Sequence, residues 1–237
     1  MMKTFPDYGT IEGSFPSVLL DVGESAARIN NLVQYSRSGK VVYWDIFAST
    51  NPWSKTASAI NTTLPMVGIN VMRLTPATTA RCYKYFPPIY RGVYGFEFMF
   101  RFTSPIDTFT IVFNKGAAAG NDARFNLTYN RTLANWNYEG AIVPLPLPGV
   151  SQAWNHIKIL YKIGVDTPGT NSCLYAVFNG YVYEINGNPA IPAASGEMLT
   201  IGWEAVDNAI PTGGIVDIDN VIITKDEPVS LPLSSAT

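Results

Sequence analysis

The chain has 237 residues, of which 47% are hydrophobic and only 14% are charged, and its net charge is −2. This length suits one all-β domain, and the apolar share is large enough for a buried core. The near-neutral charge excludes the basic surface that nucleic acid or an anionic membrane needs. No stretch approaches the roughly 20 apolar residues that span a bilayer, so we expect no membrane insertion.

Residues 1–39 differ from the rest of the chain. Four apolar residues recur there at helical spacing: Ala26, Ile29, Leu32 and Val33. Asp21 or Ser25 is suited to cap the start, so a short helix is predicted in this N-terminal extension. The extension would either lie over one end of the following domain or dock on a neighbouring copy of the chain. The second alternative would make a homo-oligomer.

The first ten residues bear on localisation. They contain no apolar run typical of a secretory signal, so we expect either no classical export or a leader that was removed. The charged share of 14% lies below the ordinary value of about 25%. Asn, Ser, Thr and Tyr supply the polarity instead. Such surfaces favour an extracellular, cell-surface or virion-associated location.

Alternating strands are predicted from Val41 onward. In Tyr94–Phe102 every second residue from position 96 is Phe, and Glu97 and Arg101 lie between them. Because strand side chains alternate between faces, the phenylalanines face the core, and Glu97 and Arg101 share the opposite face. That row lines a ligand groove if the sheet is concave there, or forms a solvated pair if it is convex. The other predicted strands in this half are 41–47, 66–74, 80–86, 108–114 and 124–129.

The second half continues the pattern after an extended, proline-rich connection at 144–148. The pair Asn179-Gly180 lies between two alternating runs, which is the strongest short-range signal for a β-hairpin. The tail 228–237 is rich in Pro and Ser, and we expect it to be loose. Residues 40–227 are therefore predicted to form one antiparallel β-sandwich. The predicted strand and hairpin segments of this half are 154–161, 174–185, 199–203 and 214–223.

Three features of this half resemble the closing half of the concanavalin A-like lectin and glucanase jelly rolls, which include laminin-G-like domains. They are a strand opening at Trp154, the Asn179-Gly180 hairpin and a last strand that contains Asp219-Asn220-Val221. The resemblance covers about residues 41–225. It implies an all-β, two-sheet antiparallel jelly-roll sandwich in a superfamily that mostly handles carbohydrate.

Enzymes of that superfamily that cut β-glucans carry a Glu-x-Asp-x-Glu-like strand, whose two carboxylates flank the scissile bond at roughly 5 Å. The nearest run here, Asp217-Ile-Asp219, lies in the closing strand, where the resemblance implies a structural role. The Arg-rich and Gln-x-His strands of the alginate-lyase branch are also missing. His156 is expected to pack and not to catalyse. We therefore expect no catalytic activity, with a divergent glycan hydrolase or lyase as the least favoured alternative.

Sugar binding needs flat aromatic faces for the apolar side of a pyranose, and amide or carboxylate groups for its hydroxyls. The densest such cluster is Asn135–Glu139, where Trp136 is expected to be exposed because polar residues surround it. Trp203 and Glu204 form a second candidate, although Trp203 shares a face with Ile201 and Ala205, which favours a place in the core. The candidate ligand-binding residues are Asn135, Trp136, Tyr138, Glu97, Arg101, Trp203 and Glu204.

Metal and thiol chemistry has weaker signals. No Cys/His cluster suits zinc, and no Gly-rich loop suits a phosphate. Oxygen ligands for a structural Ca²⁺ occur at Asn121-Asp122 and at Asp217 and Asp219, but without a spaced Asp/Asn loop, so we expect no cofactor. Cys82 and Cys173 are either buried free thiols or the two halves of one disulfide.

Two functions fit these observations. The first is a non-catalytic, lectin-like carbohydrate-binding protein whose partner is a glycan. The second is a structural or interaction protein, such as a virion or cell-surface component, that uses the jelly roll as a building block. The low charge and the possible docking arm favour the second, and self-association at high concentration would support it.

Overall fold

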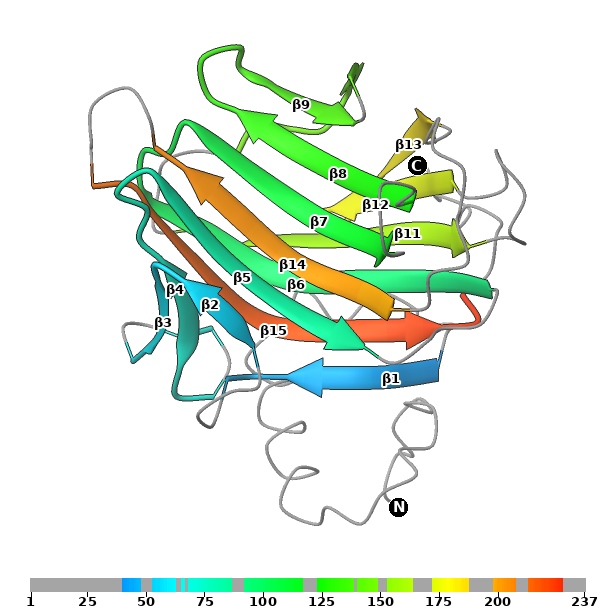
Figure 1. The fold of residues 1–237 in the computed structure, drawn as a ribbon. Coiled ribbons are helices and arrows are strands. Elements are labelled where there is room, and N and C mark those ends of the chain that lie inside the picture. The colour runs from blue at the N-terminus through cyan, green and yellow to red at the C-terminus, as the bar shows by residue number, and fades with distance from the viewer. Residues whose placement is uncertain are drawn as a thin grey trace, which may run out of the picture.

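The computed structural model describes residues 40–47, 53–62, 65–66, 68–86, 92–116, 123–138, 140–148, 153–163, 172–187, 198–207 and 213–227. Across these ranges the chain forms fifteen β-strands (Figure 1). The described residues contain no helix that is long and apolar enough to cross a membrane. The helix predicted within residues 1–39 and the tail 228–237 lie outside the described residues and stay predictions.

The strands follow one another closely along the chain. The first eight are β1 (Lys40–Asp45), β2 (Ser54–Thr56), β3 (Ser58–Asn61), β4 (Val71–Leu74), β5 (Thr79–Phe86), β6 (Gly92–Ser104), β7 (Thr108–Gly116) and β8 (Ala123–Asn130). The other seven are β9 (Asn135–Tyr138), β10 (Ala141–Val143), β11 (Asn155–Ile163), β12 (Ser172–Phe178), β13 (Tyr181–Gly187), β14 (Met198–Val206) and β15 (Ile215–Lys225).

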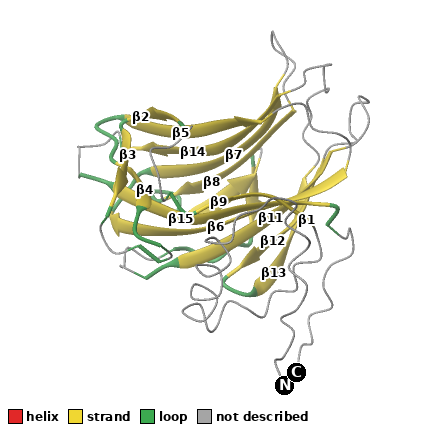
Figure 2. Cartoon of the chain, turned by 90° about the horizontal axis from the view of Figure 1, so that it is seen from below, coloured by secondary structure: helices red, strands yellow, loops and turns green. Residues whose placement is uncertain are grey.

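Two antiparallel sheets pack face to face (Figure 2). The eight-stranded sheet has the order β13-β12-β11-β6-β15-β4-β3, and β1 pairs with β15 as well. The seven-stranded sheet has the order β10-β9-β8-β7-β14-β5-β2. Consecutive strands such as β5, β6 and β7 alternate between the two sheets, so the chain passes repeatedly from one sheet to the other. The predicted all-β, two-sheet sandwich is confirmed.

The core lies between the sheets and is largely aromatic. Four phenylalanines of β6 point into it with almost no exposure, as the alternation predicted: Phe96, Phe98, Phe100 and Phe102. The Trp203 ring, from β14 of the other sheet, lies 5.2 Å from the Phe98 ring and 5.0 Å from the Trp53 ring. Burial of this apolar area is the main force that joins the two sheets.

Two short motifs have structural roles, as the resemblance implied: one forms a hairpin turn and the other forms a bulge. In the hairpin between β12 and β13, Asn179 and Gly180 have φ of 46° and 98°, which a tight hairpin turn requires. In β15, Asn220 has φ of 49° at a bulge, where the register with β6 shifts. Asp219 Oδ2 there accepts a hydrogen bond from Met66 N (2.8 Å), and Asn220 Oδ1 accepts one from Trp44 Nε1 (2.9 Å). The Asp-Asn-Val segment therefore ties β15 to neighbouring segments.

Candidate functional site

The seven predicted ligand residues lie in three different places. Trp136, Tyr138 and Trp203 are in the core, with exposed fractions of 0%, 1% and 0%. The predicted exposure of Trp136 is therefore wrong. Residues 135–138 form β9, so the two aromatic side chains point inward and Asn135 points outward. Trp136 Nε1 donates a hydrogen bond to the Pro146 carbonyl at 2.9 Å, which satisfies its polar group inside the fold.

Glu97 and Arg101 lie on the face of β6 opposite the phenylalanines, as predicted, but both are buried, at 4% and 3% exposure. Arg101 Nη2 lies 2.8 Å from Asp217 Oδ2, and its guanidinium stacks on the Trp154 ring at 4.6 Å. Glu97 Oε1 lies 3.1 Å from His156 Nε2. The alternative of a solvated pair is therefore wrong, because both side chains are buried and hydrogen-bonded across strands, while ligand binding by this row stays a prediction.

Asp217 illustrates why this network is structural. Its Oδ1 accepts a hydrogen bond from Arg73 Nε at 2.6 Å, while Arg101 occupies Oδ2. Both carboxylate oxygens are thus held by guanidinium groups, and Asp219 is held by Met66 N and Asn220 N. Among the described residues no group of three or more His, Cys, Asp or Glu is placed to hold a metal ion. The other calcium candidate, residues 121–122, lies outside the described residues.

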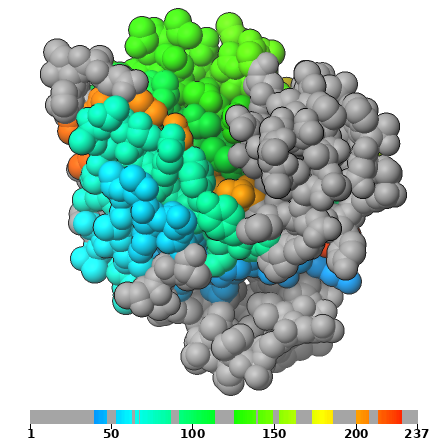
Figure 3. All heavy atoms as spheres, in the orientation of Figure 1, coloured from blue at the N-terminus to red at the C-terminus, as the bar shows by residue number. Residues whose placement is uncertain are grey.

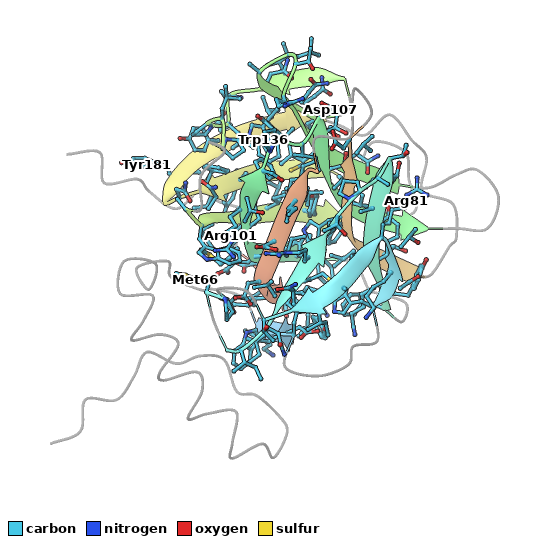
Figure 4. All side chains as sticks on the ribbon, turned by 90° about the vertical axis from the view of Figure 1, so that its left-hand side faces the viewer. Met66, Arg81, Arg101, Asp107, Trp136 and Tyr181 are labelled. Atoms are coloured by element: carbon cyan, nitrogen blue, oxygen red, sulfur yellow. The ribbon has the colours of Figure 1, made fainter. Side chains whose placement is uncertain are left out.

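The remaining two predicted residues, Asn135 and Glu204, share the outer face of the seven-stranded sheet, meaning the face turned away from the core. Figure 3 views this face, with atoms of β5, β14, β7 and β8 at its centre. Figure 4 shows Arg81, from this face, and Arg101, from the other sheet, on opposite sides of the sandwich. Most described side chains of the outer face are polar and half-buried or exposed, and the apolar ones include Val112, Val206 and Ile142. It is the candidate functional site.

One line of polar side chains crosses five adjacent strands of this face in register. We call it the polar row, and its members are Arg81 on β5, Glu204 on β14, Thr110 on β7, Thr128 on β8 and Asn137 on β9. Arg81 Nε donates to Glu204 Oε2 at 2.6 Å, and the hydroxyls of Thr110 and Thr128 lie 3.0 Å apart. Asn137 Oδ1 accepts a hydrogen bond from Gly140 N at 2.7 Å, which fixes the side chain. The N–H donors of the Asn137 amide can then bind another partner.

Tyr83 lies beside the polar row and is the best placed aromatic group on the outer face. Its partner in the register is Gly202, and a Cβ added to Gly202 would approach Tyr83 Cδ1 to 2.5 Å and the Cys82 carbonyl oxygen to 2.1 Å. Because Gly202 has no side chain, the half-buried Tyr83 ring can pack over β14. The Tyr83 hydroxyl donates to Glu204 Oε2 at 3.1 Å. Two residues along β5, Tyr85 is 53% exposed.

Electrostatics keep this group of side chains neutral overall. Burial, and then the neighbouring Glu204 carboxylate, raises the pKa of Tyr83 to about 12, so its hydroxyl stays protonated at physiological pH. The hydrogen bond to Glu204 raises the pKa of the exposed Arg81, which stays charged. On the described part of the outer face, Glu204 is the single carboxylate, and it is engaged by Arg81 and Tyr83. The arrangement can bind hydroxyl groups and stack an apolar ring face.

Sequence reasoning missed most of this site. A signal was present in β5, where Arg81, Tyr83 and Tyr85 alternate with the buried Ala80 and Cys82. Period-two alternation assigns the first three residues to the outer face. The row across the strands, in contrast, depends on register, which links residues as far apart in the sequence as Arg81 and Glu204.

No family model matches this chain, and no curated protein matches it. Several solved structures have a similar fold. The xylan-binding CBM22-1 domain of Paenibacillus barcinonensis Xyn10C aligns with a TM-score of 0.50 and 9% identity, over 82% of this chain and 99% of that one. The Emp47p carbohydrate recognition domain gives 0.52 and 12%, over 81% and 100%. Peanut lectin gives 0.53 and 13%, over 78% and 97%. The chain therefore has the jelly-roll fold of concanavalin A-like lectins and carbohydrate-binding modules.

Proposed function

We propose that this protein binds carbohydrate without chemical turnover, on the outer face of the seven-stranded sheet. The observation that carries the proposal is the Tyr83 ring, which lies over Gly202 with its hydroxyl fixed by Glu204. A flat, half-exposed ring held in one orientation suits the apolar face of a pyranose, because little side-chain entropy is lost on binding. Tyr85 extends the aromatic surface along the same strand.

The groups around Tyr83 support the proposal. The polar row supplies hydroxyl, amide, guanidinium and carboxylate groups, which are the partners that sugar hydroxyls need. Hydrolysis of a glycosidic bond ordinarily requires two carboxyl groups on either side of that bond. The described part of the outer face offers Glu204 alone, already engaged by Arg81. Two of the similar solved structures are named for xylan binding and for carbohydrate recognition.

A glycan-array screen tests the proposal with three proteins. These are the wild type, Tyr83→Ala and the control Tyr181→Ala. Tyr181 is 70% exposed and lies on β13 at the edge of the other sheet, so it matches the residue type and not the location (Figure 4). We expect glycan binding by the wild type and by Tyr181→Ala, and its loss in Tyr83→Ala. Binding that survives Tyr83→Ala, or no binding by any of the three, would contradict the proposal.

A structural role is a second proposal, and exposed apolar side chains favour it. Leu133, Ile142 and Leu147 lie within one segment of the chain and are 66%, 71% and 50% exposed. Apolar surface of this kind is common at contacts between proteins. A virion or cell-surface component that assembles through this segment would self-associate as its concentration rises. Light scattering of the wild type and of Ile142→Ser measures this, and a concentration-independent monomer would exclude assembly of this kind.

A further inference from the structure

The polar row spreads its residues across the sheet and does not gather them at one point, although Arg81 pairs with Glu204 and Thr110 with Thr128. Each of five adjacent strands contributes one side chain at the same register position. Neighbouring strands lie about 4.8 Å apart, so the row from Arg81 to Asn137 spans roughly 19 Å. A site for one terminal sugar would need several polar groups converging on a single ring. A line of polar residues with one on each strand instead suits an extended ligand that repeats a similar unit along its length.

We propose that the outer face takes an extended, neutral polysaccharide chain that lies along the polar row, across the strands. This inference rests on the proposed carbohydrate-binding function and adds the class of ligand. The strand spacing of about 4.8 Å is close to the advance per sugar of an extended β-1,4-linked chain, so about four successive sugars would each meet a new strand. The chain then presents repeating hydroxyls to repeating side chains.

Charge decides between neutral and acidic polysaccharides. The polar row contains two charged residues, Arg81 and Glu204, and they pair with each other at 2.6 Å. The row therefore has no net charge to attract a uronate polymer, and an acidic chain would meet the Glu204 carboxylate. A neutral xylan- or glucan-like chain is the chemistry that this arrangement fits.

Residues at the far end of the polar row should contact long ligands and not short ones. Tyr83 lies next to Glu204, so a mono- or disaccharide stacked on its ring reaches only that end of the row. Thr128 and Asn137 lie two and three strands away from Glu204 and are within reach of a longer chain alone. Thr128→Val keeps the side-chain shape and removes one hydroxyl. It is expected to weaken the binding of long chains and to leave short ones unchanged.

Titration calorimetry on the full chain tests this with xylo- and cello-oligosaccharides from the monosaccharide to the octasaccharide, and with oligogalacturonates as the acidic series. We expect affinity to rise steeply up to about the tetrasaccharide and then to level off, because about four strand spacings are then filled. Thr128→Val should bind the hexasaccharide about fivefold more weakly, the effect of one hydrogen bond, and the disaccharide with unchanged affinity.

The other outcomes discriminate between the two proposals. A monosaccharide that binds as tightly as the hexasaccharide would overturn the extended-chain inference and leave carbohydrate binding at Tyr83 intact. Preferential binding of oligogalacturonates would overturn the assignment of the ligand to the neutral polysaccharides. Absence of binding to every series, and to every glycan of the array, would overturn the proposed function itself.

Discussion

The Lys158 ammonium lies 2.6 Å from Glu227 Oε1, and its side chain reaches that carboxylate across Gly95 of the intervening strand β6. A Cβ on Gly95 would lie 2.9 Å from Lys158 Cε and 3.0 Å from Glu227 Oε1. The Thr224 hydroxyl also donates to Glu227 Oε1. Both charged side chains are almost completely buried. This contact joins β11, β6 and the end of β15 on the face of the eight-stranded sheet that points away from the core.

The first prediction concerns that ion pair. Glu227→Ala leaves the Lys158 charge buried without its carboxylate, which should lower the free energy of unfolding by about 3–5 kcal/mol. The control is Asp226→Asn, because Asp226 is exposed and precedes Glu227 directly. The control should change stability by less than about 0.5 kcal/mol. Urea denaturation measures both, and equal effects from the two substitutions would refute a structural role for the pair.

The second prediction compares two tryptophans that are both 0% exposed. Trp136 Nε1 donates to the Pro146 carbonyl, whereas Trp203 Nε1 is buried and has no hydrogen-bond partner among the described residues. Trp136→Phe therefore loses a hydrogen bond, while Trp203→Phe removes an unsatisfied donor. We expect Trp136→Phe to be the more destabilising by about 1–2 kcal/mol. A larger loss in Trp203→Phe, measured by urea denaturation, would contradict the assigned hydrogen bonding.

The wrong prediction that Trp136 is exposed shows why a short segment is hard to assign from sequence. Asn135 and Asn137 flank it, and polar residues around an aromatic residue are typical of a surface loop. The same four residues alternate strictly, and that period describes a strand with its tryptophan inward. The phenylalanines of Tyr94–Phe102 could be placed correctly because nine residues of alternation leave one solution. The four residues of β9 are too few to distinguish a strand from a loop.

The third prediction concerns the two cysteines, which are free and buried, as one of the two sequence alternatives held. Burial raises the pKa of the Cys82 thiol to about 12, and burial also raises the pKa of the Cys173 thiol. A thiol rather than a thiolate is therefore present at neutral pH, and thiols react slowly. A thiol reagent should label neither residue in the native protein and both in urea. Rapid labelling of the native protein at either residue, detected by mass spectrometry, would contradict their burial.

The fourth prediction uses the pH dependence of stability. Burial and Glu204 raise the pKa of Tyr83 from 10.0 to about 12 in the folded protein. Because the folded state holds this proton more tightly, the stabilisation is complete below pH 10 and is lost as pH rises from about 10 to about 12. Tyr83→Phe has no such proton, so its stability should fall less steeply over this interval. Urea denaturation at several pH values measures both, and parallel curves would contradict the raised pKa.

The candidate site was harder to predict than the fold because it depends on register. Glu97 and Arg101 could be assigned to one face of β6 from spacing alone. Their partners are His156 and Asp217, which become neighbours only when β11 and β15 pair with β6. The same holds for Tyr83, whose ring position requires Gly202 opposite it in β14. Alternation gives the face of a residue, and only the pairing of strands gives its neighbours.

The most direct test of a carbohydrate site on the outer face is to map where a sugar chain binds. Backbone amide shifts of isotope-labelled protein, titrated with xylohexaose and with cellohexaose, give this map for the wild type and for Tyr83→Ala. We predict that the shifts induced by at least one of the two ligands cluster on β5, β14, β7 and β8, and that Tyr83→Ala abolishes them. Shifts confined to the eight-stranded sheet, or unchanged by Tyr83→Ala, would contradict the site.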